Sequence, residues 1–485
     1  MRNSVCLHPL LYLVLLFTVP FDEGFAQVDF NHYRPRSNHL ATSTELIESL
    51  KHNLRQEIVA LAESENFQTV KRLNAERTKL IINMVEHGAF IKDDSLETYV
   101  NKVLDNIFNS NGITAGQARV LILDSPQINA YCFGQGIYVV TIGLLGRISS
   151  EDELAFTIAH EVAHDMLGHI KKRLIQEAEV SLAKKSREQI RKIMTGTIEV
   201  KDVQEYRTLI YSARKHNRVR EMEADSMGML LIQEAAYAQE AGFAVLTALD
   251  ESLKPKFDIG PDLIWPLNST EYPLQEGWFN KRLSIYSRGY TDSYLYTVDS
   301  IESHPDIALR KDRIEYYVRN DIAAQYHQPE EFAEAVTLLA EFETLQSAYE
   351  KRSFDRCMFY ALQLLNRYPQ NPFLISRIGK ILISLYEAKN NNDNTFLNFV
   401  PRYTAYYSDE LTLVNNMLHN LTTKELGELT FHFLNDPEHF NPEERSHYYL
   451  LWRISDLTYR KNIADDIKRA FRERFNGSIA GYRFR

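Results

Sequence analysis

The sequence has few cysteines, no basic run and a single long apolar stretch, and each scarcity excludes a class of protein. Three of the 485 residues are cysteine, which is too few for a scaffold built on disulfides. The formal net charge is −10 and Lys and Arg do not cluster, so we expect no nucleic-acid binding. What remains is an ordinary globular composition, 44% hydrophobic and 25% charged, long enough for two or three domains.

The first 26 residues have the three parts of a secretory signal peptide. Arg2 gives a basic start, the stretch from Leu10 to Val19 is apolar, and Gly24-Phe25-Ala26 supplies a small-residue cleavage site. The apolar stretch is short for a bilayer, which favours cleavage over an uncleaved anchor. No later segment is long and apolar enough to span a membrane. We therefore expect an exported chain with no transmembrane span after cleavage.

Hydrophobic periodicity predicts helices first and a small sheet afterwards. Three helices are expected over residues 43–65, 66–87 and 94–109, because their apolar residues fall near one face. Strands are expected over 118–123, 129–133 and 137–142, with Gly134-Gln135-Gly136 as a hairpin signal between the last two. An exposed edge of this sheet could hold an extended peptide by strand addition, and plain core packing is the alternative for the same strands.

The helix expected after Ser150 contains two candidate metal ligands and the candidate general base. Ser150 and Glu153 fit a capping box, which places the start of the helix here. His160 and His164 are four residues apart and therefore lie on one face, with Glu161 between them. In this H-E-x-x-H arrangement two imidazoles bind zinc and the glutamate acts on a metal-bound water. A helix with two partly buried, hydrogen-bonded histidines is the alternative.

A catalytic zinc needs three protein ligands and one open position, so a further ligand is expected. Glu221 lies on a second predicted helix and would complete a His-His-Glu set. Asp225 faces the same side of that helix and could hydrogen-bond a ligand histidine from behind. In the alternative interpretation these acids form a surface charge cluster with Arg218 and Arg220.

Together these motifs resemble the HtpX-like zinc metallopeptidases, gluzincins that include the CAAX prenyl endopeptidases and the periplasmic BepA-type proteases. The resemblance spans roughly residues 80–315 and is carried by Asn129-Ala130, Gly136 to Thr141, Asp152-Glu153-Leu154-Ala155, His160-Glu161-Val162-Ala163-His164, His169, Arg218, Glu221-Met222-Glu223-Ala224-Asp225, Gly228 and Ser303-His304-Pro305. Because no later membrane span is expected, the chain is most similar to the soluble exported branch. That similarity implies that the chain is located in the periplasm, where it could also associate with the outer membrane.

The resemblance implies one zinc ion per chain and a role for each motif residue. His160, His164 and Glu221 would be the metal ligands, Glu161 the general base and Asp225 the hydrogen-bond partner of a ligand. The sheet before the helix would supply the edge that holds the substrate. The residues assigned to that edge are Asn129, Ala130, Gly136, Ile137 and Tyr138.

His304 is the least defined of the candidate catalytic residues. The resemblance brings its loop to the active site, where it could fill the open position of the zinc or stabilise the oxyanion. Asp306 departs from the family pattern of a small residue or second proline, which leaves the local geometry open. Arg310 or Arg313 could take the oxyanion role instead. His169 is expected to make a structural hydrogen bond and not to bind the metal.

After Ile314 the sequence turns to helices rich in Leu, Ala, Glu and Tyr. The stretch from Ala348 to Pro369 resembles the end of a tetratricopeptide (TPR) unit, and Ile375, Ile378 and Gly379 could begin the next. A generic helical bundle is the alternative. This region carries no catalytic constellation, so we expect it to bind substrates or partner proteins.

These observations predict an α+β protein in three parts. A signal peptide (1–26) precedes a mainly helical gluzincin metalloprotease domain (27–315), which has a small sheet beside the active-site helix, and an α-helical, TPR-like domain (316–485) follows. The predicted function is that of a zinc endopeptidase acting on exported proteins, in particular unfolded or misassembled envelope proteins. The alternative is a chaperone or assembly factor for envelope proteins with a latent or structural zinc site. Whether Cys132 and Cys357 pair is open.

Overall fold

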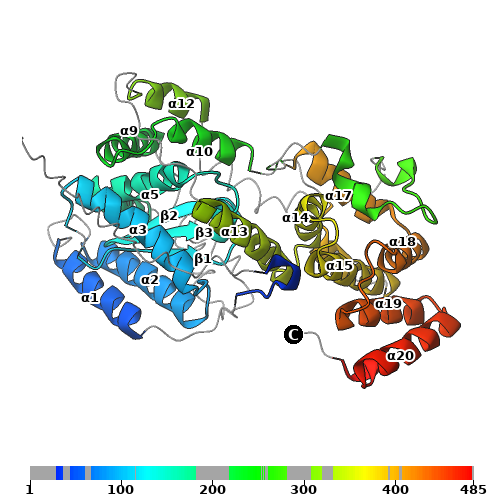
Figure 1. Cartoon of the computed structure of the whole chain (residues 1–485). Coiled ribbons are helices and arrows are strands. Elements are labelled where there is room, and N and C mark those ends of the chain that lie inside the picture. Colours follow the sequence, from blue (N-terminus) through cyan, green and yellow to red (C-terminus); the bar gives the residue numbers. More distant parts are fainter. Residues whose placement is uncertain are drawn as a thin grey trace, which may run out of the picture.

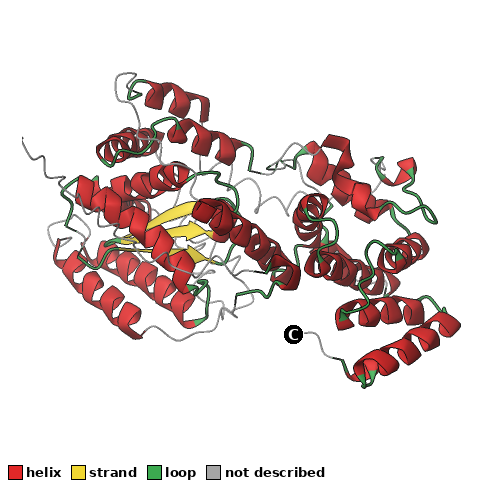
Figure 2. Cartoon of the chain, in the orientation of Figure 1, coloured by secondary structure: helices red, strands yellow, loops and turns green. Residues whose placement is uncertain are grey.

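Two adjoining assemblies of helices make up the structure, and one of them encloses a small sheet (Figures 1 and 2). The computed structural model describes residues 29–36, 44–60, 67–114, 116–181, 218–252, 254, 256, 260–280, 307–318, 331–391, 394–402 and 407–482. The predicted α+β class is confirmed, since helices dominate and the sheet has three strands. Within these residues no helix is long and apolar enough to cross a bilayer.

The sheet-bearing assembly follows the predicted order of helices and strands closely. Its elements are α1 (Thr44–Ala60), α2 (Phe67–Glu86), α3 (Asp94–Ser110), β1 (Arg119–Leu123), β2 (Ala130–Gly134), β3 (Ile137–Thr141), α4 (Ile142–Leu145), α5 (Glu151–Met166), α6 (His169–Ser181), α9 (Arg218–Glu234), α10 (Ala241–Asp250) and α12 (Ile307–Glu315). The short helices η1 (Phe30–His32), η2 (Gly260–Leu267) and η3 (Glu276–Trp278) pack against helices of the second assembly. Helix α5 starts where predicted, because Ser150 caps it by accepting a hydrogen bond from the backbone N–H of Glu153 at 3.2 Å.

The sheet has the strand order β1-β3-β2, with β3 parallel to β1 and antiparallel to β2. Ile137 and Tyr138 therefore lie on the central strand, where Ile137 pairs with Arg119 on one side and Gly134 on the other. Their predicted place on a substrate edge is wrong, because a strand paired on both sides cannot receive a further strand. Among the described strands, β2 has a neighbour on one side only.

Helices also fill the second assembly, in which elements close in sequence pack against each other (Figure 1). They are α13 (Glu331–Glu350), α14 (Phe354–Arg367), α15 (Pro372–Asn390), α16 (Thr395–Phe399), α17 (Asp409–Asn420), α18 (Thr423–Asn435), α19 (Arg445–Leu457), α20 (Lys461–Phe475) and η5 (Ile479–Gly481). Helix α13 packs against both α4 and α14 and so joins the two assemblies. Cys132 on β2 and Cys357 on α14 are both buried free thiols, which answers the open question of their pairing.

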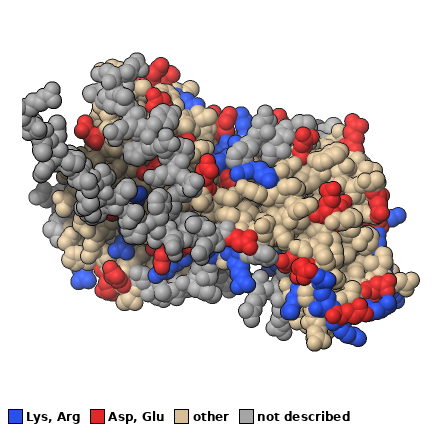
Figure 3. Space-filling model, in the orientation of Figure 1, with Lys and Arg blue, Asp and Glu red and all other residues tan. Residues whose placement is uncertain are grey.

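Acidic and basic side chains are interspersed over the described part of the face drawn in Figure 3. Ion pairs also join neighbouring elements of the second assembly, such as Arg453 on α19 with Glu387 on α15 at 2.6 Å and Arg460, just before α20, with Glu428 on α18 at 2.6 Å. Such partly exposed pairs contribute little to stability individually. The stability of this assembly therefore rests on its buried apolar side chains.

The segment 29–36 is bound to helix α13 through the buried carboxylate of Glu343. The hydroxyl of Tyr33 and the backbone N–H of Arg36 both donate to this carboxylate, the latter at 2.7 Å. The ring of Tyr33 lies against Phe342 and Phe373, with centroid distances of 4.9 and 4.8 Å. Burial raises the pKa of Glu343 to about 7, although its two hydrogen-bond donors act in the opposite direction.

We expect the stability of the chain to fall as the pH rises from about 4.5 to about 7. A carboxyl whose pKa is raised by folding stabilises the folded state fully below its unfolded value near 4.5 and loses that contribution on ionising near 7. The shift corresponds to ~3 kcal/mol at most. In urea denaturation across this pH range, the free energy of unfolding of Glu343→Gln should not fall with pH. That of Glu334→Gln, an exposed position on the same helix, should fall as in the unchanged protein. An identical slope in both variants would rule out this carboxyl as its source.

Candidate metal centre

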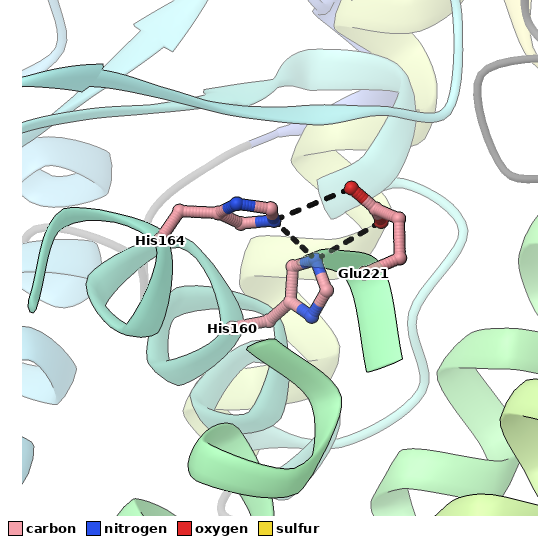
Figure 4. Close-up of side chains that lie close together, drawn as sticks. All are labelled: His160, His164 and Glu221. Carbon is pink, nitrogen blue, oxygen red and sulfur yellow. Dashed lines mark hydrogen bonds and ion pairs between the residues drawn. The ribbon is translucent and has the colours of Figure 1, made fainter. Parts of the chain in front are cut away.

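Close packing of α5 on α9 brings the predicted ligands together (Figure 4). His160 and His164 stand one turn apart on α5, and Glu221 lies in the first turn of α9. Gly228 on α9 permits this approach, because a Cβ at that position would lie 3.3 Å from both the Cα and the N of His160. A larger side chain there would push the two helices apart and with them the carboxylate and the imidazoles.

The three side chains present their ligating atoms to one small volume. His160 Nε2 lies 3.1 Å from His164 Nε2, and each of these nitrogens lies 3.5 Å from an oxygen of Glu221. A tetrahedral zinc with ligand bonds of about 2.0–2.1 Å would separate its ligand atoms by about 3.3 Å. All three residues are buried, and two imidazoles with one carboxylate are a catalytic zinc donor set. The residues present therefore fit a zinc ion.

Asp225 contacts His160 on the side of the ring away from the ligating nitrogen, and Arg310 in turn binds Asp225. The Nδ1 atom of His160 lies 2.9 Å from Asp225 Oδ1, and this contact leaves Nε2 on the other side of the ring for a metal. Arg310 on α12 donates through Nε and Nη2 to the two oxygens of Asp225, each at 2.7 Å. Burial alone would raise the pKa of Asp225, but Arg310 and His160 hold it below its usual value. The carboxylate is therefore charged when it orients the imidazole.

His164 is held by a second chain of side chains that the sequence did not reveal. Its Nδ1 lies 2.9 Å from Nδ1 of His169, and His169 Nε2 lies 3.1 Å from Glu223 Oε2. If His164 uses Nε2 for a metal, its Nδ1 proton is donated to His169, whose own proton is donated to Glu223. Burial lowers the pKa of His169, which favours the neutral ring that this arrangement needs. His169 thus makes a structural hydrogen bond, and that bond is to a ligand.

Replacing His169 by alanine should weaken metal binding by roughly 10–100-fold, because His164 would lose the partner that fixes its ring. The affinity can be measured by competition with a chromophoric chelator. His87→Ala is the matched control, since His87 is exposed just after α2 and should leave the affinity unchanged. Equal affinities for the two variants would contradict a positioning role for His169.

The remaining candidate residues are not among the three ligating side chains. Glu161 is buried on α5 directly after His160. Asn129 directly precedes β2 and Ala130 begins it; both are buried, and β2 is one of the two edge strands of the described sheet. His304 lies outside the described residues, and its role stays a prediction. Two nitrogens of Arg310 donate to Asp225 and its Nη1 lies 3.6 Å from Glu221 Oε2, and the oxyanion role considered for it stays a prediction.

Gly136 and Tyr138 contact the metal-bearing helix instead of forming an exposed edge. The amide of Gly136 donates to Asp165 Oδ2 at 2.9 Å, and the hydroxyl of Tyr138 donates to the same oxygen at 3.3 Å. Asp165 directly follows His164 on α5. These bonds fix the end of the metal-bearing helix relative to the sheet, so both residues position the site from its far side. Arg313 is likewise a local contact, with its Nε donating to Ser226 Oγ at 3.2 Å.

The described residues place two histidines and one glutamate together in a mainly helical fold, which is a donor set found in zinc metallopeptidases. Comparison with known proteins gives the same class. Residues 94–318 match the family model described as Peptidase family M48, a segment that contains β1 to β3, α5, α9 and α12. The matched segment is less than half of the chain.

Three curated relatives carry similar stretches of sequence. The mitochondrial metalloendopeptidase OMA1 of Arabidopsis thaliana is 29% identical over 119 residues, 24% of this chain and 23% of the relative. The mitochondrial metalloendopeptidase OMA1 of Homo sapiens is 34% identical over 74 residues, 14% of each chain. That of Bos taurus is 27% identical over 109 residues, 22% of this chain and 20% of the relative. Each matched stretch thus spans less than a quarter of the relative's length.

Proposed function

We propose that this chain is a zinc-dependent endopeptidase that hydrolyses peptide bonds in unfolded proteins. The observation that carries the proposal is the buried set of His160, His164 and Glu221, whose ligating atoms all lie within 4.8 Å of one another. Glu161 follows His160 on the same helix and is not part of that set. The match to Peptidase family M48 and the metalloendopeptidase relatives support the same activity.

A zinc ion bound there would polarise the scissile carbonyl and lower the pKa of the attacking water. Glu161 would accept a proton from that water and pass it to the leaving amine. Asp225 and the pair of His169 and Glu223 would keep the Nε2 atoms of both histidines directed to the metal position. Each of these residues acts through proton transfer or orientation, which is how this chain's own side chains would contribute to catalysis.

An extended substrate segment would add to the sheet at β2. Among the described strands, β2 is paired only to β3, and it packs against α5. Strand addition uses main-chain hydrogen bonds and therefore requires an extended segment of substrate. Asn129 and Ala130 stand at the start of this strand. A folded protein seldom offers such a segment, which supports unfolded substrates.

We further propose that the chain is exported and acts in the periplasm on unfolded or misassembled envelope proteins, with association with the outer membrane as a narrower form. The support is the sequence of residues 1–26, which precedes the described part of the chain, and the resemblance to the soluble BepA-type branch. In this proposal the helices after residue 316 bind substrate or partner proteins in a TPR-like manner. A reporter fused after residue 26 should reach the exported fraction, and its retention inside the cell would exclude export.

Removing the metal should stop proteolysis, and returning zinc should restore it. The substrate is a reduced and alkylated protein, which stays unfolded, and its cleavage is followed on a gel before and after treatment with 1,10-phenanthroline. The same protein in its folded, disulfide-bonded form is the matched control and should resist cleavage. Hydrolysis that continues at the same rate without metal would exclude a zinc peptidase.

A further inference from the structure

The segment 260–280 crosses from the sheet-bearing assembly to the helical one. In sequence it lies between α10 and α12, two helices that pack against each other in the sheet-bearing assembly. Its own short helices, drawn in green in Figure 1, contact the other assembly, η2 against α14 and η3 against α17. The last part of the segment, residues 272–280, lies on α17 and α18.

Two asparagine side chains of α17 bind the main chain of this last part. Asn420 donates from Nδ2 to the carbonyl oxygens of Trp278 and Asn280, at 2.9 and 2.6 Å. One turn earlier, Asn416 donates to the carbonyl oxygen of Phe279 at 3.4 Å. Because every polypeptide has such carbonyl groups, these contacts would hold a segment of another protein equally well.

Trp278 supplies the one contact that depends on a particular side chain. It is 2% exposed, and its Nε1 donates to Glu425 Oε1 at 3.2 Å. The other oxygen of Glu425 accepts from the backbone N–H and the hydroxyl of Thr422, at 2.8 and 2.7 Å. The carboxylate is thus oriented by its own helix. A buried tryptophan in such a prepared site is the kind of residue that contributes most to binding.

The other side chains of residues 272–280 are half-buried or exposed. The half-buried ones are Tyr272, Leu274 and Phe279, and the exposed ones are Pro273, Gln275, Glu276, Gly277 and Asn280. The ring of Tyr272 stacks on that of His432 on α18, with centroids 5.5 Å apart. One buried anchor with main-chain contacts around it is the pattern of a peptide on a binding surface.

We propose that the α17–α18 surface, made of Asn416, Asn420, Glu425 and His432, binds a non-helical segment of an unfolded protein that carries a tryptophan. Residues 272–280 of this chain occupy the surface as a built-in copy of that ligand. Tryptophan is highly buried on average in folded proteins, so an accessible one marks an unfolded chain. The proposal rests on the proposed role of the helices after residue 316 in binding proteins, and names their ligand.

The tethered segment and a free peptide would compete for the same surface. A tethered ligand acts at an effective concentration on the order of millimolar. A free peptide at micromolar concentration would therefore displace little of it. Removing the anchor of the tethered segment should open the surface, which makes the competition measurable.

A labelled synthetic peptide with the sequence of residues 269–280 tests the proposal by fluorescence anisotropy. Every chain carries Glu161→Gln, so the peptide is not hydrolysed and its binding is measured whether or not the chain is a peptidase. Adding Trp278→Ala should tighten peptide binding by at least about 10-fold, because the tethered competitor loses its anchor. Trp265→Ala is the matched control, since Trp265 lies on η2, is 64% exposed and should leave the weak binding unchanged.

Changes in the peptide itself need no variant chain to fold. Alanine in place of its tryptophan should weaken binding to the Trp278→Ala chain by about 10-fold or more. A peptide that keeps the tryptophan and has serine or alanine elsewhere should bind within about 10-fold of the original, because the main-chain contacts remain. Failure of this peptide while the original binds would show that the surface accepts its own segment alone, which overturns the proposal.

Asn420→Leu added to the Trp278→Ala chain should weaken the original peptide by about 10-fold, because two hydrogen bonds to its main chain are lost. Asn462→Leu is the matched control, because Asn462 is exposed on α20. If Trp278→Ala does not fold, hydrogen exchange of the chain that keeps its tryptophan decides. An excess of the serine-alanine peptide should speed exchange of residues 276–280. Equal peptide binding by Trp278→Ala and Trp265→Ala, or unchanged exchange, would overturn the proposal.

Discussion

Replacing Glu161 by glutamine is expected to abolish peptide-bond hydrolysis while the fold and the metal content stay unchanged. Glu161 is buried on α5 beside the ligand His160, but the cluster of ligating atoms does not include it. Glutamine keeps the shape of the side chain and cannot accept the proton of the attacking water. Losing a positioned general base costs about 10²–10⁴-fold in rate. Metal analysis and a cleavage assay on the same preparation measure the two expectations together.

Glu234→Gln is the control for this variant, since Glu234 is exposed near the end of α9 and should leave the rate unchanged. Undiminished cleavage by Glu161→Gln in a pure preparation would exclude Glu161 as the base. A cellular experiment then separates the peptidase from an assembly factor with a latent metal site. Full function of Glu161→Gln in cells, together with loss of function on truncation after Ile314, would identify binding as the main task.

The metal ligands could be predicted because the helix itself fixes their spacing. Residues four apart lie on one face, so His160 and His164 had to converge, and Glu221 with Asp225 repeats the same geometry on a second helix. The structure brings these four side chains together as that reasoning expects. Which helix supplies the third ligand is a long-range property, and the resemblance carried by Glu221-Met222-Glu223-Ala224-Asp225 indicated it.

The strand order could not be predicted from the same sequence. Central and edge strands of a small buried sheet have the same apolar residues, and β2 and β3 are both buried along their length. The parallel pairing of β1 with β3 places β3 in the centre, although β2 lies between them in sequence. A hairpin signal fixes the neighbours β2 and β3 and leaves open which of them receives β1. The assignment of Ile137 and Tyr138 to an edge failed for this reason.

Contacts between distant segments were equally hidden. Tyr33 and Glu343 are 310 residues apart in the chain, and Arg310 and Asp225 are 85 apart. No periodicity or spacing in the sequence links such pairs, because their proximity follows from the packing of whole helices. For His169 the sequence predicted a structural hydrogen bond but not its partner, although the five-residue separation places it near His164 at the end of α5. Its partner Glu223 belongs to α9 and required the structure.

Arg310→Met should destabilise the chain by about 3–5 kcal/mol, because it leaves a buried carboxylate without its partner. Arg310 is 2% exposed, and Asp225 is fully buried. Without the guanidinium, burial would raise the pKa of Asp225, and a protonated Asp225 orients His160 poorly. We therefore also expect metal affinity to fall by roughly 10–100-fold. Urea denaturation of the metal-free protein and chelator competition measure the two effects separately.

Arg313→Met on the same helix is the matched control, because Arg313 is exposed and contacts the hydroxyl of Ser226 and the ring of Tyr317 instead of a carboxylate. A double-mutant cycle with Asp225→Asn then isolates the charge pair. Removing both charges should cost less than the sum of the single changes, since neither ion is left buried alone. Additive losses would show that Arg310 acts through packing of α12 against α9. Arg310→Lys should recover only part of the stability, because an ammonium cannot form the two parallel bonds that the guanidinium makes to Asp225.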